Sequence, residues 1–201
     1  MNAKLKETIL NPILKGNPIT VLVLGICSSL AVTVELKGAL VMALSVIVVC
    51  GMSSLICSLL RKTIPNRVRI IIQLVVVAMM VILVDQVLKA FAYTIDKQLS
   101  VYIGLIITNC IVMGRIEAFA LGNKPWPSLV DGFANGLGYG LIIIVVAFFR
   151  ELLGSGTLFG LHVLPAGYVP NNLVILPPFA LILLGCIIWA HRAFDKELQE
   201  K

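Results

Sequence analysis

The chain has 201 residues, of which 59% are hydrophobic and 13% charged, with a formal net charge of +6 and a mean hydropathy of +1.03. Water-soluble domains contain about 25% charged residues, so this composition excludes a soluble catalytic or flavin-binding domain. The basic residues occur in short clusters between apolar runs, which is typical of membrane topology and argues against nucleic acid as a partner. The sequence therefore predicts a protein that lies in the lipid bilayer.

Six apolar runs predict six transmembrane helices in a single all-α membrane domain, residues 1–201. A helix of about 20 residues spans a bilayer and satisfies its own backbone hydrogen bonds there. The first run is short and the fourth contains Gly114, Arg115 and Glu117, so we expect both helices to be discontinuous. In chain order the runs are roughly Ile19–Val34, Gly38–Leu60, Val68–Phe91, Leu99–Phe119, Phe133–Leu153 and Leu173–Ala193.

The distribution of lysine and arginine predicts the orientation of these helices. The N-terminal head, the connections after the second and fourth runs, and the tail carry most of the basic residues, which places both termini in the cytoplasm. The runs divide into two sets of three, about residues 1–93 and about residues 98–201. Because each set has an odd number of spans, two such repeats would enter the membrane from opposite sides. The sequence therefore predicts two inverted three-helix repeats.

Two cysteines occupy corresponding positions in these halves. Cys27 follows Asn17 by ten residues, and Cys110 follows Ser100 by ten residues. Ten helical residues rise ~15 Å, about half the hydrocarbon thickness, so we expect both thiols near the midplane. Thiolates select iron–sulfur centres, zinc and Cu(I), and two are half of the usual set of four, so a metal site here would need a second chain. The spacing alone leaves open the alternative that both are packing residues.

Small and polar residues flank the two cysteines, and they would let the helices approach and donate hydrogen bonds to a buried anionic centre. They are Gly25, Ser28, Ser29, Thr108 and Asn109. The other three cysteines, Cys50, Cys57 and Cys186, have no ligand spacing and are interpreted as packing residues. Gly132, Gly136 and Gly140 recur every fourth residue and predict a close helix contact.

Three charged residues inside or near the runs have two interpretations each. Asp85 is a candidate Na⁺ contact, but an ion pair with Lys89 one turn later is favoured. Arg115 and Glu117 follow Cys110 and would either stabilise the charge of a buried centre or mark the membrane interface.

Several segments resemble the D-type membrane subunits of the bacterial sodium-translocating NADH:quinone oxidoreductases, in the NqrDE/RnfAE family. The resemblance covers nearly the whole chain, with Ile116 as a minor deviation where a small residue is expected. Its most specific segments are Gly25–Ser28 with Leu30–Thr33, Leu105–Ala120, Asp131–Gly132, Asn135–Gly140 and Arg150–Gly156.

This resemblance implies that Cys27 and Cys110 bind a [2Fe–2S] cluster shared with a paralogous E-type subunit of opposite orientation. It implies a six-subunit translocase in the bacterial inner membrane that passes electrons from NADH to ubiquinone and exports Na⁺. FAD, FMN, riboflavin and quinone would belong to other subunits, and the flavin-bearing membrane-anchored subunits would contact this chain. The chain would relay electrons within the complex, and no catalysis is expected of it in isolation.

Three alternatives stay open at this point. The equivalent subunit of an Rnf ferredoxin:NAD oxidoreductase shares the cysteine motifs. A secondary transporter would have inverted repeats and broken helices, with a substrate site at the midplane and no iron. A purely structural subunit would tolerate replacement of Cys27 and Cys110.

Overall fold

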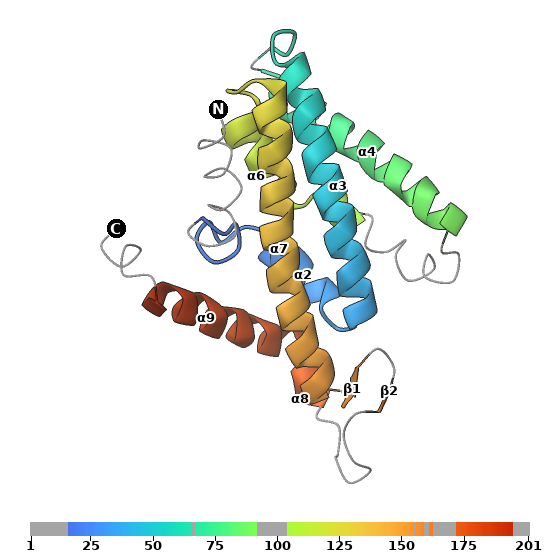
Figure 1. Ribbon diagram of the computed structural model, residues 1–201, viewed down its shortest axis with the longest axis vertical. Coiled ribbons are helices and arrows are strands. Elements are labelled where there is room, and N and C mark those ends of the chain that lie inside the picture. Colours follow the sequence, from blue (N-terminus) through green and yellow to red (C-terminus); the bar gives the residue numbers. More distant parts are fainter. Residues whose placement is uncertain are drawn as a thin grey trace.

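The computed structural model describes residues 16–65, 67–91, 104–154, 156–158, 161–162 and 172–194, and this part of the chain is almost entirely helical. Its two longest helices, α3 (Leu36–Leu60) and α7 (Pro125–Gly154), lie side by side (Figure 1). Helix α4 (Arg69–Phe91) leads away from the end of α3, and α9 (Pro177–Phe194) extends from the opposite end of α7. The remaining elements are α2 (Ile26–Val32), α6 (Cys110–Arg115), η1 (Ile116–Ala120), α8 (Asn172–Ile175), and the short paired strands β1 (Thr157–Leu158) and β2 (Leu161–His162).

Helices α3, α4 and α7 are long and apolar enough to cross a membrane, and residues Pro177–Ala193 of α9 form a shorter apolar helix. These correspond to the second, third, fifth and sixth predicted runs. Helix α7 begins at Pro125 rather than at Phe133, and the sixth run is divided into α8 and α9. Pro177 and Pro178 lack the amide protons needed to continue α8, which accounts for that division. The structure thus confirms an all-helical, membrane-type fold.

The first and fourth runs are discontinuous, as expected, but in the fourth run the break lies elsewhere than the sequence indicated. The first run contains only the seven-residue helix α2, preceded by turns. In the fourth run, the residues between helical segment 104–107 and α6 are Thr108 and Asn109, so the break precedes Cys110. The expected break at Gly114 was wrong, because the chain continues there from α6 into the π-helix η1.

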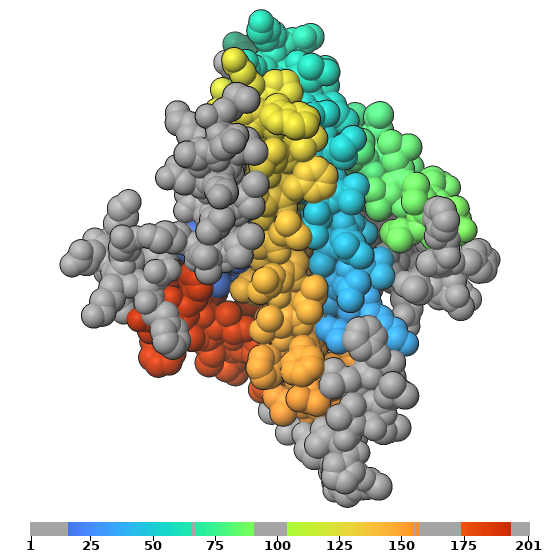
Figure 2. Space-filling model, in the orientation of Figure 1, coloured from blue at the N-terminus to red at the C-terminus, as the bar shows by residue number. Residues whose placement is uncertain are grey.

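The contact between α3 and α7 is close because glycines of α7 lie against the α3 backbone. A Cβ atom on Gly132 would lie 2.7 Å from the Cys50 carbonyl oxygen, and one on Gly136 would lie 2.8 Å from the Ile47 Cα atom. Gly140 lies against Ala43, so residue numbers rise along α7 as they fall along α3. The predicted glycine contact is therefore confirmed, and the two helices are antiparallel. Figure 2 shows them packed along their length.

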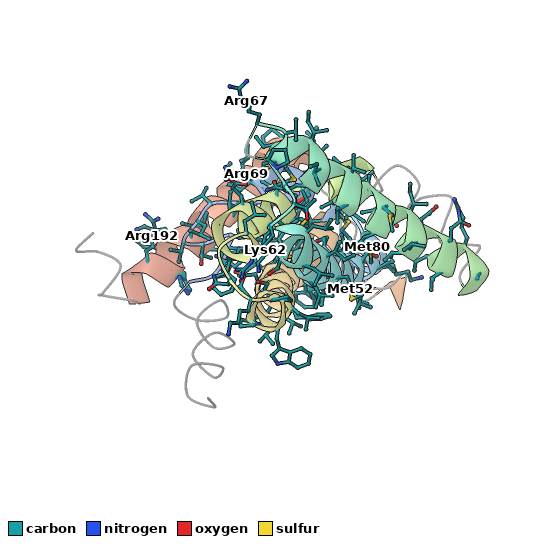
Figure 3. The ribbon with its side chains drawn as sticks, turned by 90° about the horizontal axis from the view of Figure 1, so that it is seen from above. Met52, Lys62, Arg67, Arg69, Met80 and Arg192 are labelled. Atoms are coloured by element: carbon teal, nitrogen blue, oxygen red, sulfur yellow. The ribbon has the colours of Figure 1, made fainter. Side chains whose placement is uncertain are left out.

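One end of the bundle carries a group of basic residues. The chain passes there from α3 to α4, and the Arg61 guanidinium donates to the Asn123 carbonyl oxygen at 2.7 Å, which brings the connection before α7 to the same end. Lys62 and Arg67 lie in the same connection and Arg69 begins α4, and Figure 3 views the molecule from this end. The two connections that the positive-inside rule assigns to one side of the membrane are thus neighbours.

Candidate metal centre

The two cysteine-bearing segments meet at the middle of α7, around Tyr139. This fully buried tyrosine is the fifteenth of the thirty residues of α7. Its hydroxyl lies 2.5 Å from the Ser28 hydroxyl oxygen, and it accepts a hydrogen bond from the Asn109 side-chain amide at 3.3 Å. Ser28 follows Cys27, and Asn109 precedes Cys110. The structure therefore brings together the two segments that carry the cysteines that the sequence singled out.

The direction of each hydrogen bond around Tyr139 follows from its neighbours. The Asn109 Oδ1 atom accepts from the Ile111 backbone amide, so Nδ2 is the atom that faces Tyr139. The Ser28 hydroxyl donates its single proton to the Gly25 carbonyl oxygen at 3.0 Å. Tyr139 must then donate to Ser28. The hydrogen bonds therefore all point in one direction, from Asn109 at the start of α6, through Tyr139 of α7, to Ser28 in α2.

The thiols of Cys27 and Cys110 are free and exposed, whereas the polar residues next to them, Ser28 and Asn109, are buried. The cysteines therefore present their sulfur atoms on the surface of the chain at the level of the α7 midpoint. Cys50 and Cys57 are fully buried in the hydrophobic core, in agreement with a packing role. Cys186 is exposed on α9.

The route to Cys27 differs from the ten-residue helix assumed in the sequence argument. Asn17 is buried, and its side-chain amide donates to the Gly138 carbonyl oxygen at 3.2 Å, so it lies beside the middle of α7. Residues 17 to 25 turn back on themselves and do not rise through half the membrane. Val23 and Gly25 both have positive φ, at 58° and 81°, which permits this compact path. Cys27 reaches the middle of α7 nonetheless, because Asn17 and Ser28 bind adjacent residues of that helix.

Glycine is required at position 25 both for its positive φ and for lack of space. A Cβ atom there would lie 2.8 Å from the Ile111 Cδ1 atom and 2.9 Å from the Tyr139 Cε2 atom. The turn before α2 thus packs directly on the first turn of α6 and on the tyrosine ring. This contact, like the hydrogen bonds, joins the two cysteine-bearing segments.

Arg150 and Glu151 of α7 hold the far side of the α2 segment. The fully buried Arg150 guanidinium donates to the Leu30 carbonyl oxygen at 3.1 Å, to the Thr33 hydroxyl at 2.6 Å and to the Ile175 carbonyl oxygen at 2.5 Å. The Glu151 carboxylate accepts from the Leu36 amide at 2.6 Å, where α3 begins. Carbonyl groups at the ends of two short helices and an amide at the start of α3 are thereby satisfied inside the membrane-type fold.

The charged residues after Cys110 have partners within the chain. The Arg115 guanidinium binds both carboxylate oxygens of the buried Asp131, at 3.0 and 2.5 Å. Glu117 accepts from Gln73 at 2.8 Å and forms an ion pair with Arg69. Within the described residues these contacts link α6 and η1 to α4 and α7, and neither side chain is placed at the Tyr139 centre.

Asp85 forms the favoured pair with Lys89, with 2.6 Å between Oδ2 and Nζ. The two residues are one helical turn apart on α4, as an i, i+4 pair requires. The predicted ion pair is confirmed.

The thiol pair fits half of a thiolate-bound metal centre. Among the described residues, no three His, Cys, Asp or Glu side chains lie close enough to hold a metal ion together. Two exposed soft ligands, held on segments with fixed hydrogen bonds, match the chemistry of a site completed by ligands from another chain. The donor set therefore fits an iron–sulfur centre or another thiolate site shared across an interface.

The sequence did not identify Tyr139 as the common partner of Ser28 and Asn109. The two polar residues were expected to donate to a buried anionic centre, but their side chains instead bind the Tyr139 hydroxyl and backbone groups. The sequence did contain a signal for this role, since Tyr139 stands between two glycines in the middle of an apolar run. A tyrosine buried there needs a hydrogen-bond partner for its hydroxyl.

Apolar helices of membrane-spanning length, with a polar centre halfway along the longest, define a helical integral membrane protein. The model of the family described as "Rnf-Nqr subunit, membrane protein" matches residues 5–188. The chain belongs to this family. It is 54% identical to the D subunit of the Na(+)-translocating NADH-quinone reductase of Aeromonas hydrophila subsp. hydrophila, over 99% of this chain and 98% of that protein. The same component of the Aeromonas salmonicida reductase matches with equal identity and coverage.

Proposed function

We propose that the chain is the D-type membrane subunit of a sodium-translocating NADH:quinone reductase, an oxidoreductase complex of the bacterial inner membrane. In it, Cys27 and Cys110 bind half of a [2Fe–2S] cluster, and a paralogous E-type subunit supplies two further thiolates. The cluster would carry one electron at a time across the middle of the membrane. The chain's own residues would hold the segments that carry the two thiolates, through the contacts of Tyr139 with Ser28 and Asn109.

The convergence of Cys27 and Cys110 carries this proposal. The two residues are far apart in the sequence, yet Tyr139 binds the residue beside each of them. Cys50 and Cys57 are buried, as packing cysteines usually are, whereas Cys27 and Cys110 are exposed next to the buried Ser28 and Asn109. Exposed thiols on segments that lie beside the middle of α7 suit a centre between two subunits. Such a centre would divide a ~30 Å hydrocarbon core into two shorter electron transfers.

The arrangement of the helices supports two inverted three-helix repeats and six spans in this proposal. Each half has a short helix with the cysteine in its first two residues, α2 or α6, and then a long helix, α3 or α7. The two long helices are antiparallel, as the glycine contacts show. Corresponding helices of opposite direction are what repeats of inverted topology would have. With the basic end of the bundle in the cytoplasm, both termini would be cytoplasmic.

Two of the alternatives are weaker after the comparisons. The two relatives are named as sodium-translocating quinone reductase subunits, which favours that branch over the equivalent Rnf subunit. A transporter shares the discontinuous helices, but the polar groups at the α7 midpoint are bound to one another by hydrogen bonds, which leaves the thiols as the exposed chemistry there. FAD, FMN, riboflavin and quinone are assigned to other subunits, and the flavin-bearing subunits are proposed neighbours.

The test is the iron and acid-labile sulfide content of the purified complex, with wild type compared with Cys27→Ala and Cys110→Ala. Each variant is expected to lose one [2Fe–2S] equivalent together with NADH-driven quinone reduction. Cys186→Ala is the matched control, because its thiol is also exposed but lies on α9. Equal iron content in all four preparations would disprove the shared cluster and return Cys27 and Cys110 to a structural role.

A further inference from the structure

The Tyr139 hydroxyl lies between the two cysteine-bearing segments and belongs to neither. Its neighbours on both sides are residues adjacent to a cysteine, Ser28 and Asn109, and it contacts each of them from a third helix, α7. Tyr139 is fully buried, and its ring lies against Gly25, where a Cβ atom would come within 2.9 Å of Cε2. Ring and hydroxyl thus touch both segments at once.

The hydrogen bonds on either side of the hydroxyl end on backbone groups next to the cysteines. On one side, Asn109 holds the Ile111 amide at 3.2 Å, and Ile111 follows Cys110 directly. On the other side, Ser28 holds the Gly25 carbonyl oxygen at 3.0 Å, two residues before Cys27. A shift of Tyr139 would therefore move the backbone on which each thiol is mounted.

We infer that Tyr139 is a positioning residue that sets the separation of the Cys27 and Cys110 thiols and, through it, the geometry and the electronic properties of the centre they bind. This inference rests on the proposed function. Tyr139 acts through Ser28 and Asn109 rather than as a ligand. Second-sphere groups that orient ligands tune a metal centre in this way, and their loss weakens metal retention as well as changing its electronic state.

The experiment uses the intact purified complex with Tyr139→Phe, which keeps the ring against Gly25 and removes the hydroxyl. We expect a cluster that is present but has an altered electron paramagnetic resonance spectrum and a shifted midpoint potential. We also expect iron to be lost to a chelator about fivefold faster, the factor that one lost hydrogen bond produces. The control is Ser45→Ala, whose buried hydroxyl donates to the Val41 carbonyl oxygen of its own helix.

A double-mutant cycle separates the hydrogen-bonded chain from a general effect on folding. Ser28→Ala removes the group that accepts from Tyr139, so it should change the spectrum and iron loss in the same direction. The double variant should then change little beyond either single variant, because the same interaction is already broken. Ser28→Ala alone also tests the inference if Tyr139→Phe fails to assemble.

Spectra, potentials and iron-loss rates equal to those of Ser45→Ala would overturn the inference. That outcome is distinct from failure of the proposed function. If Cys27→Ala keeps full iron content, the shared cluster is wrong; if Cys27→Ala loses iron while Tyr139→Phe behaves as wild type, only the role of Tyr139 is wrong.

Discussion

The α3–α7 contact predicts that Gly132→Ala destabilises the protein although alanine is the better helix former. The added Cβ atom would lie 2.9 Å from the Gly51 Cα atom and 2.7 Å from the Cys50 carbonyl oxygen. Non-bonded carbon atoms prefer about 3.5 Å, so the helices must separate locally by about 0.6 Å. Both neighbours are backbone atoms, so no side chain can rotate to relieve the overlap.

The expected change in the free energy of unfolding is the difference between two opposing effects. Overpacking of this kind costs about 1–3 kcal/mol, and replacing a helical glycine by alanine contributes at most about 1 kcal/mol in the other direction. With the full opposing term subtracted, the net loss in the free energy of unfolding is up to about 2 kcal/mol. The series Gly132, Gly136 and Gly140 should be graded, because a Cβ atom on Gly140 would approach the Ala43 Cβ atom to 3.1 Å and its other neighbours only to 3.8 Å.

The assay is the temperature at which the detergent-purified complex loses its single elution peak in size-exclusion chromatography. Gly38→Ala in α3 is the matched control, since a Cβ atom there meets nothing within 4 Å. We expect a lower transition temperature for Gly132→Ala and an unchanged or slightly higher one for Gly38→Ala. Equal transition temperatures for the two variants would refute the close backbone contact.

Two further predictions concern buried residues outside the Tyr139 centre. Arg150→Lys replaces a forked guanidinium, which binds Leu30, Thr33 and Ile175, by a single ammonium group. We expect the free energy of unfolding to fall by about 2–3 kcal/mol, which the same chromatographic assay would record as a lower transition temperature. An unchanged transition would show that these contacts add nothing to stability. Cys50→Ala removes only the sulfur atom of a core residue, so it should cost about 1 kcal/mol and leave the iron content of the complex at the wild-type value. Iron loss in this variant would contradict the packing role.

Hydropathy in the sequence was sufficient to predict the membrane helices that satisfy their own hydrogen bonds. Helices α3 and α4 have bounds close to the predicted runs, because a continuous apolar run in lipid can form only a helix. The glycine contact was also predictable, since residues spaced by four lie on one helix face whatever the partner. The Asp85–Lys89 pair follows from the same local rule. These features depend on residues within one or two helical turns of each other.

The break before α6 was misplaced, and the turns before α2 were not predicted in detail, because their causes are distant in the sequence. Arg115 was expected to interrupt a helix, but Asp131 neutralises it, so the chain stays helical there. The turns before Cys27 are stabilised by the bond from Asn17 to Gly138, which no local pattern records. A polar residue in an apolar run is tolerated in a helix when it has a partner and breaks the helix when it has none. Only the folded chain shows whether that partner is present.

The sequence by itself determined that this is a helical membrane protein with two candidate thiol ligands, because hydropathy and side-chain chemistry are properties of the residues themselves. Only the tertiary structure decided that the segments carrying Cys27 and Cys110 meet, and that they do so around Tyr139. The bonds that join them connect Ser28 to Tyr139 across 111 positions and Asn109 to Tyr139 across 30. Contacts of such separation arise from the packing of α2, α6 and α7 against one another, which the order of residues along the chain does not express.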